Sequence, residues 1–301
     1  MSEALYGRRV EVIVGLQGKP GYSLVSASPL LSMEPAYRID FAVTDAVGDG
    51  KPAQAVVTIC NPPKRLVADL LTGEKAFISI AAGYGDRAGL LFAGKPLRDG
   101  VEFSRESADT KLKITAMTGG TAYRDTYSTI SLNSNAVVVS LVEQLCKEMG
   151  FTIVKNDIPT SLTYPRGFSH AGTAASALSR LSRYAKVHMS ISATGEVRFL
   201  DPNNDQVLAS SQEKVPLFSS ITGTLIGMVS KTDKGTKFRG LLISGLSPGK
   251  QVVLEHYDAL GRSLVRSTLV LRDVKYDGST EKKNFYVTCV GRVVKSERVV
   301  T

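Results

Sequence analysis

The chain has 301 residues, of which 43% are hydrophobic and 22% are charged, a composition typical of a globular protein with room for two or three domains. It contains no run of about 18 apolar residues, which excludes a membrane-spanning helix. The formal net charge is +9. Most of the excess lies in residues 206–301, which hold 15 Lys and Arg against 8 Asp and Glu.

The N-terminal sequence passes directly into an alternating segment. Glu3 stands where a signal peptide would carry basic residues, which predicts that the chain has no signal peptide and is made in the cytoplasm. The three cysteines, Cys60, Cys146 and Cys289, are far apart in the sequence and form no CxxC motif. We therefore expect buried free thiols rather than a disulfide, zinc or redox site.

Short alternating segments dominate the first 120 residues and predict a small β-barrel or sandwich. The segments predicted as strands are 8–15, 37–45, 55–60, 77–83, 89–97 and 110–117. Asn61-Pro62-Pro63 ends the third strand, because proline cannot continue a ladder. Thr118-Gly119-Gly120 is the expected exit from this domain.

A glycine segment in this region matches a nucleotide-binding motif. Gly83-Tyr84-Gly85-Asp86-Arg87-Ala88 has the G-x-G-x-x-G/A spacing, which binds a dinucleotide only if a helix follows. Gly94 and Pro96 prevent such a helix. The prediction is a β-hairpin over residues 77–94 that binds no nucleotide.

The middle of the chain has helical periodicity instead. Apolar residues in 136–150 recur at helical spacing, with Gly150 placed to end the helix, and a second helix is predicted in 173–187. A short strand at 151–155 and a hairpin over 187–200 complete a small α+β module. The polar segment 201–206 is a candidate domain boundary.

The last third returns to short strands, predicted in 238–245, 250–257, 263–276 and 284–294. Its segment 245–278 resembles 77–94, since each consists of a strand, a glycine-containing turn and a return strand. The fold class is therefore β-rich α+β, with β domains at 1–120 and 206–301 flanking the α+β domain at 121–205.

No motif in the sequence carries catalytic or metal chemistry. His170, His188 and His256 lack metal-ligand spacing, and neither HExxH, GxSxG nor GxxxxGK[ST] occurs. We predict no enzyme activity, no cofactor and no metal.

The densest basic run, Lys231 to Gly240, contains Lys231, Lys234, Lys237 and Arg239. It is either a nucleic-acid surface or a face for a neighbouring subunit or an acidic partner. Phe238 is the only aromatic residue in the run, which favours the partner interface.

Several segments together resemble the baseplate hub proteins of tailed bacteriophages, the late-control tail protein family, and more distantly the hub part of type VI secretion spike proteins. They are LYGRRVEVIVG, VVTICNPPKRLVADLLTGEKAFISIAAGYGDRAGLLFAGKPL, LVEQLCKEMGFTIV, ALSRLSRYAKVHMSISATGEVRFLD, GLSPGKQVVLE and TLVLRDVKYDGSTEKKNFYVTCVGR. Their order covers residues 5–295.

The resemblance implies a mechanism of assembly. Two tube-protein-like barrels per chain would form a homotrimeric ring of pseudo-six-fold symmetry. It would adapt the hexameric tail tube to the three-fold central spike, with other baseplate proteins around it. DNA would pass through the lumen without specific binding, and the protein would reside in the virion with no membrane insertion. A basic nucleic-acid-binding module and a tail-tip cell-wall hydrolase are the alternatives.

Overall fold

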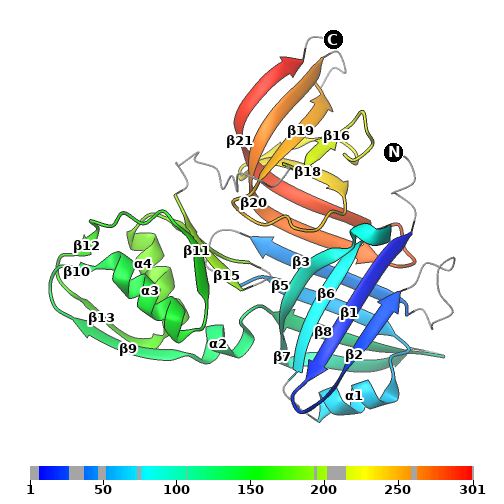
Figure 1. The fold of residues 1–301 in the computed structure, drawn as a ribbon, viewed down its shortest axis with the longest axis horizontal. Helices are drawn as coiled ribbons and strands as arrows, with labels where there is room; N and C mark the ends of the chain where they lie inside the picture. The colour runs from blue at the N-terminus through cyan, green and yellow to red at the C-terminus, as the bar shows by residue number, and fades with distance from the viewer. Residues whose placement is uncertain are drawn as a thin grey trace.

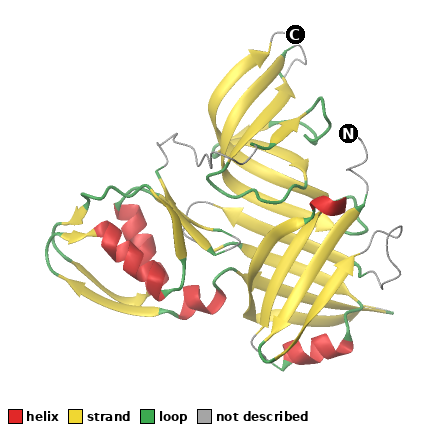
Figure 2. Cartoon of the chain, viewed as in Figure 1, coloured by secondary structure: helices red, strands yellow, loops and turns green. Residues whose placement is uncertain are grey.

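A computed structural model describes residues 7–26, 37–46, 52–72, 76–106, 108–192, 195–201, 215–258 and 263–299. Strands dominate, most of them in one large and mainly antiparallel sheet, and the helices are few (Figures 1 and 2). The prediction that the protein is β-rich is therefore confirmed. We call residues 7–118 the first β region, 119–201 the middle region and 215–299 the second β region.

The first β region contains every strand predicted for it. Its elements are β1 (Arg8–Leu16), β2 (Lys19–Ser26), β3 (Ile39–Ala46), β5 (Gln54–Cys60), α1 (Lys64–Leu71), β6 (Ala76–Tyr84), the 3₁₀ turn η2 (Gly85–Arg87), β7 (Gly89–Glu106) and β8 (Asp109–Met117). The strands pair in the order β3-β5-β8-β7-β6-β1-β2. Alternation buries Val10, Val12 and Val14 completely.

The glycine segment forms the predicted hairpin. β6 pairs antiparallel with β7 from Ile78 opposite Gly94 to Ala82 opposite Gly89. Only the three-residue turn η2 and Ala88 separate the strands, so the helix that a dinucleotide motif needs is replaced by a return strand. Gly85 has a φ of +53°, a backbone conformation that favours glycine.

The middle region holds both predicted helices. Its elements are α2 (Gly120–Asp125), β9 (Tyr127–Leu132), β10 (Ala136–Val137), α3 (Val138–Glu148), β11 (Thr152–Asn156), β12 (Thr163–Tyr164), β13 (Phe168–Thr173), α4 (Ala174–Tyr184), β14 (His188–Ile191) and β15 (Glu196–Leu200). Thr173 caps α4 by accepting a hydrogen bond from the Ser176 backbone N–H at 3.3 Å. The predicted hairpin is β14–β15, and positions 193–194 of its turn lie outside the described residues.

The second β region contains the four strands predicted there and two more. They are β16 (Leu217–Ser219), β17 (Ser230–Thr232), β18 (Gly235–Leu241), β19 (Gln251–Tyr257), β20 (Leu264–Ser279) and β21 (Phe285–Val299). The predicted strand at 238–245 begins earlier and ends at Leu241, where its pairing with β21 stops. Most of the candidate boundary at 201–206 lies outside the described residues.

One strand pairing joins the two β regions. β3 pairs antiparallel with β20, from Ala46 opposite Asp273 to Asp40 opposite Ser279, so a single sheet runs from β17 to β2. Buried side chains of both regions belong to one hydrophobic cluster, whereas the middle region has a cluster of its own. The boundaries 1–120, 121–205 and 206–301, and the closure of each β region into a barrel, remain predictions.

Candidate functional site

Reactive side chains do not gather into a centre in the described part of the chain. No group of three or more His, Cys, Asp or Glu there could hold a metal ion. The three cysteines are free and buried, as expected, and burial raises the pKa of Cys146 to about 12. None of the described helices is long and apolar enough to cross a membrane. The candidate functional sites of this part of the chain are therefore exposed surfaces.

The four basic residues of the predicted interface lie on one hairpin. Lys231 is on β17, Lys234 is in the turn, and Lys237 and Arg239 are on β18, all four exposed. β17 pairs only with β18 and ends the strand order of the large sheet. We call residues 230–241 the basic hairpin. It is an edge of the sheet, which a neighbouring molecule could cover.

The hairpin divides these cations between its two faces. Lys237 and Arg239 are two positions apart on β18 and share one face. Lys234 is 3.9 Å from Asp273, which also lies on that face. Lys231 is opposite Thr236 and therefore points to the other face. The structure thus gathers three of the four predicted residues and leaves Lys231 apart.

The face that carries Lys237 and Arg239 continues across both β regions. One transverse row of the sheet reads Arg239, Thr288, Lys275, Thr44 and Gln54, each opposite the next, so their side chains share a face. All of these are polar and at least partly exposed. We call this surface the polar sheet face.

Lysines pair with the carboxylates of the polar sheet face. The pairs join Lys275 to Asp277 at 3.1 Å, Lys113 to Glu102 at 3.1 Å, Lys282 to Asp40 at 3.0 Å and Lys234 to Asp273 at 3.9 Å. Positive and negative charges therefore alternate over most of this surface, whereas Lys237 and Arg239 at its β18 end form no ion pair with a described residue.

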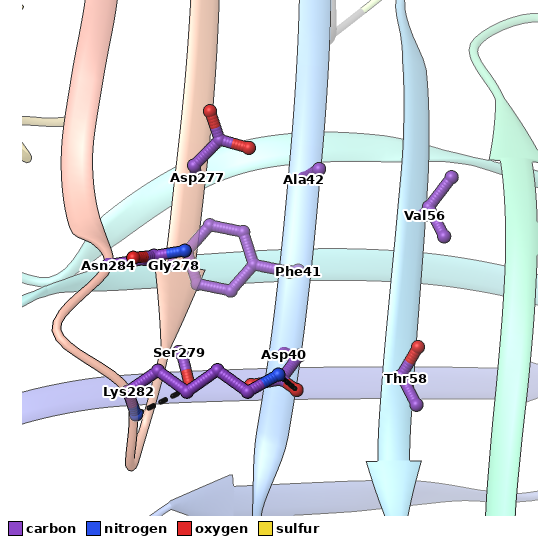
Figure 3. Close-up of a pocket in the computed structure, with 10 residues that line it drawn as sticks. All are labelled: Asp40, Phe41, Ala42, Val56, Thr58, Asp277, Gly278, Ser279, Lys282 and Asn284. Atoms are coloured by element: carbon purple, nitrogen blue, oxygen red, sulfur yellow. Dashed lines mark hydrogen bonds and ion pairs between the residues drawn. The ribbon is translucent and has the colours of Figure 1, made fainter.

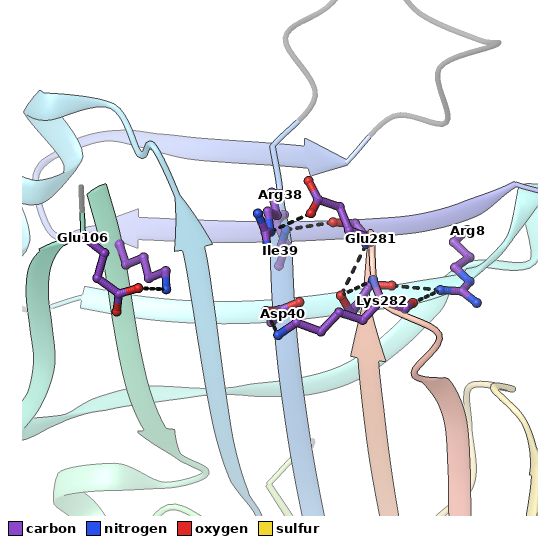
Figure 4. Close-up of polar contacts among 10 residues, drawn as sticks. Arg8, Arg38, Ile39, Asp40, Glu106, Glu281 and Lys282 are labelled. Carbon is purple, nitrogen blue, oxygen red and sulfur yellow. Dashed lines mark hydrogen bonds and ion pairs between the residues drawn. The ribbon is translucent and has the colours of Figure 1, made fainter. Parts of the chain in front are cut away.

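A clamp holds the β20–β21 turn of the second β region against the first (Figure 4). The Arg8 guanidinium donates to the backbone carbonyls of Ser279 at 3.2 Å, of Lys283 at 3.4 Å and of Lys282. Arg38 forms an ion pair with Glu281 at 2.9 Å. The turn is thus fixed to β1 and β3 by contacts between residues more than 240 positions apart.

Asp40 forms the second ion pair of this clamp. Burial raises the pKa of Asp40, but hydrogen bonds from Ser279 and Lys282 and the charges of Lys282 and Arg38 outweigh it and hold the pKa below its ordinary value. Asp40 is therefore a carboxylate at neutral pH, and its ion pair with Lys282 helps to fix the two β regions to each other.

A shallow groove of about 220 Å³ follows the β3–β20 pairing (Figure 3). Its lining residues are Asp40, Phe41, Ala42, Val56, Thr58, Asp277, Gly278, Ser279, Lys282 and Asn284. Its volume is below the range of about 300–1,000 Å³ typical of cofactor and ligand pockets. Both carboxylates already have a lysine partner, so the groove is better explained as a seam between the β regions than as a binding pocket.

Sequence reasoning identified the basic hairpin but missed the clamp and the polar sheet face. The hairpin has a local signal, the density of Lys and Arg in 231–240. The clamp has none, since Arg8 and Lys282 become neighbours only through the strand order. A weak signal for the polar sheet face exists in the polar positions that alternate along β3, at Asp40 and Thr44, and along β20.

Solved structures of other proteins share the fold of this chain. No family model and no curated protein matches the sequence. A tail protein from Neisseria meningitidis MC58 matches with a TM-score of 0.59 and 11% identity over 96% of each chain. The 43 kDa tail protein of prophage MuSo2 from Shewanella oneidensis matches with a TM-score of 0.56 and 10% identity over 95% of this chain and 96% of the other.

The Escherichia coli c3393 protein, a component of the type VI secretion system, matches with a TM-score of 0.56 and 12% identity over 95% of this chain and 79% of its own. Identities this low establish likeness of fold only. The resemblance noted in the sequence is confirmed at that level: nearly the whole chain is folded like phage tail proteins and a type VI secretion component.

Proposed function

We propose that this protein is a structural hub of a bacteriophage tail or baseplate, located in the virion and without enzymatic activity. The observation that carries the proposal is the joining of two β regions in one antiparallel sheet, within a fold shared with tail proteins over 95% or more of this chain. A chain whose two β regions share one sheet is suited to an assembly in which each chain supplies two units.

The proposed assembly is a homotrimeric ring. Three chains with two β regions each would give six similar units, which can meet a hexameric tail tube on one side and a three-fold central spike on the other. A closed ring would also cover sheet edges such as β17, which otherwise invite uncontrolled pairing. The clamp supports this arrangement, because it keeps the two units of a chain in a fixed orientation.

The polar sheet face, apart from Lys237 and Arg239 at its β18 end, would line a channel for DNA. It spans both β regions, and its carboxylates are paired with lysines, so a passing polyanion would meet a hydrated wall of alternating charge. Sequence-independent binding to DNA depends on unneutralised Lys and Arg facing the phosphates. A charge-matched wall fits a lumen through which DNA passes without being held.

The basic hairpin would contact an acidic partner, such as the tail tube or another baseplate protein. Four carboxylates of the first β region offer it little, because Glu11, Asp69, Glu102 and Glu106 each form an ion pair with a neighbouring Arg or Lys. We expect the complementary negative charge on a different protein. Rim charges of this kind contribute about 0.2–1 kcal/mol each and mainly accelerate association.

The trimer is tested by measuring mass in solution. Light scattering of the purified protein should give three chains per particle, held by obligate interfaces that commonly bury more than about 2,000 Å². A stable monomer at micromolar concentration, together with no trimer in isolated tails, would rule out the ring.

The basic hairpin is tested by reversing Lys231, Lys234, Lys237 and Arg239 to Glu. Tail assembly should slow while circular dichroism stays unchanged. A variant with Lys64, Arg65, Arg124 and Lys147 reversed changes the net charge equally and should assemble normally. A gel shift with duplex DNA at two salt concentrations tests the nucleic-acid alternative. Tight, salt-sensitive binding that the hairpin variant loses, with assembly intact, would favour that alternative.

A further inference from the structure

α4 lies beside β13, and its C-terminal end is near β12 (Figure 1). Aromatic rings and arginines cluster where these elements meet. The rings of Tyr164 and Tyr184 have centroids 4.4 Å apart, and the Tyr184 hydroxyl donates to the Thr163 carbonyl at 2.9 Å. Tyr164 also meets Phe168 edge to face at 5.4 Å. The Tyr184 ring is thus fixed in place while 37% of the residue stays exposed.

Arg180 borders these rings, and both Arg180 and Arg183 are held in position by neutral groups. The Arg180 guanidinium lies 5.2 Å from the Phe168 ring centre and donates to the Ser169 carbonyl at 3.2 Å. Arg183, one turn along α4, donates to the Ser179 carbonyl at 3.2 Å. Both side chains are exposed. Because both side chains are already ordered, binding an anionic partner would cost little further side-chain entropy.

The positive charge of this face lacks a matching carboxylate. Arg166, in the turn between β12 and β13, and Lys186, just after α4, add two more exposed cations. Among the described residues, no ion pair joins Arg166, Arg180, Arg183 or Lys186 to an acidic side chain. On the polar sheet face, by contrast, Lys275, Lys113 and Lys282 each pair with an Asp or Glu. The α4 face therefore presents uncompensated charge beside an exposed ring.

We propose that this face, formed by Tyr164, Tyr184, Arg166, Arg180, Arg183 and Lys186, binds single-stranded nucleic acid. An exposed aromatic ring, such as that of Tyr184, can stack on an unpaired base, and cations beside it neutralise the phosphates. A duplex buries its base faces and cannot use the rings. An acidic peptide could use the cations but would leave the rings unexplained. The inference goes beyond the hub role and holds or fails independently of it.

The basic hairpin lacks this combination, although it carries more of the charge noted in the sequence. Its Arg239 guanidinium lies 4.3 Å from the Tyr286 ring centre and covers that ring itself. Phe238 is buried in the core, with only 1% exposed. The hairpin therefore supplies a matched control with cations and no free ring.

The test is fluorescence anisotropy of the full chain with fluorescein-labelled oligo(dT) of 12 nucleotides, a length within the usual site size. The wild-type protein should bind saturably at low salt, and an unlabelled duplex of equal length should compete at least tenfold less well. Tyr184→Ala should weaken binding about tenfold, since one base stack contributes about 1–3 kcal/mol. Tyr184→Phe keeps the ring and should bind within twofold of wild type.

A charge variant provides a second readout that a purely structural role would not change. Arg180→Gln with Arg183→Gln should lower the slope of log affinity against log salt by about 1.4, or about 0.7 for each lost phosphate contact. Lys237→Gln with Arg239→Gln on the hairpin should leave the slope unchanged. The proposal fails if wild type shows no saturable binding, if duplex competes equally, or if both pairs of substitutions reduce the slope alike. If the Tyr184→Ala variant does not fold, the slopes of log affinity against log salt for the two pairs of charge substitutions decide whether the proposal holds.

Discussion

The contacts that join the two β regions to each other differ from those that join the middle region to them. The β regions, separated by about 100 residues of sequence, share a sheet and a hydrophobic cluster, and their seam is lined with aromatic rings such as Phe41, Tyr84 and Phe285. The middle region has a separate cluster around α3 and α4. It meets the rest through contacts such as the Ala53 N–H to Ile191 carbonyl hydrogen bond at 3.2 Å. Strand pairing, not sequence proximity, thus decides which parts form one body.

The side chains near the middle region's contact are also more polar. β14 and β15 bury one face in the middle cluster, while Ser190 and Arg198, opposite each other across the hairpin, lie on the other face with exposures of 0% and 5%. A polar contact offers less hydrophobic stabilisation than the aromatic seam. The β regions should therefore unfold together and the middle region separately.

The largest effect is expected from Phe285→Ala at the aromatic seam. Phe285 is 2% exposed, and its ring centre is 5.2 Å from that of Tyr84. Removing the ring should cost about 3–5 kcal/mol of unfolding free energy, the usual range for a buried Phe. Hydrogen exchange should accelerate in both β regions and remain slow in α3 and α4. Acceleration confined to residues 230–299 would show that the β regions are independent.

Leu178→Ala tests whether the middle region can lose stability without the β regions. Leu178 is fully buried in the α3–α4 cluster. The free energy of unfolding should fall by about 2–5 kcal/mol, because apolar burial is lost and a cavity is left behind. Faster exchange should appear in the middle region, while β1, β6 and β20 keep their protection. If the whole chain lost protection to the same extent, the two clusters would be one cooperative unit.

Gly278→Ala should loosen the seam by a smaller amount. A Cβ at this position would stand 2.2 Å from the Phe41 ring, so the ring or the β3–β20 pairing must shift. Overpacking of this kind costs about 1–3 kcal/mol. Gly15→Ala is the control, because the nearest atom to its Cβ would be 3.9 Å away, and it should be neutral or slightly stabilising. Equal stability of the two variants in urea would contradict the close packing of Gly278 against the Phe41 ring.

Local patterns predicted the elements better than their arrangement. Alternation identified β1, β3, β5 and β8, helical spacing identified α3, and the glycines with Pro96 identified the β6–β7 hairpin. β2 was missed, since Lys19, Pro20 and Gly21 at its start have low strand propensity and their strand is fixed by pairing with β1.

The same difference between local patterns and long-range arrangement applies to the candidate site. The basic hairpin was found because its residues are adjacent in sequence, but the division of Lys231 from Lys237 and Arg239 depends on strand register. The Tyr164–Tyr184 stack and the clamp arise from long-range contacts with no local signal. Sequence periodicity shows which side of an element is buried and leaves open which element buries it.

The smallest effect is expected from the ion pair across the seam. Asp40 and Lys282 join the β regions at 3.0 Å, with 29% and 58% of their side chains exposed. The folded protein holds the pKa of Asp40 below its ordinary value, so folding favours the carboxylate form. That stabilisation is complete above the ordinary pKa of about 3.9 and is lost as pH falls through the lower folded value. Exposure to solvent limits it to less than about 1 kcal/mol.

Asp40→Asn should therefore reduce stability in urea at pH 7 and pH 5 by the same small amount. The difference from wild type should shrink only below about pH 4, where wild-type Asp40 also loses its charge. Asp69→Asn is the control, because Asp69 pairs with Lys19 inside the first β region and its pKa is also lowered. Only Asp40→Asn should also accelerate exchange in the β20–β21 turn. If the Asp40 difference instead disappeared near pH 6, or the turn exchanged as in wild type, the ion pair would not be helping to hold the two regions together.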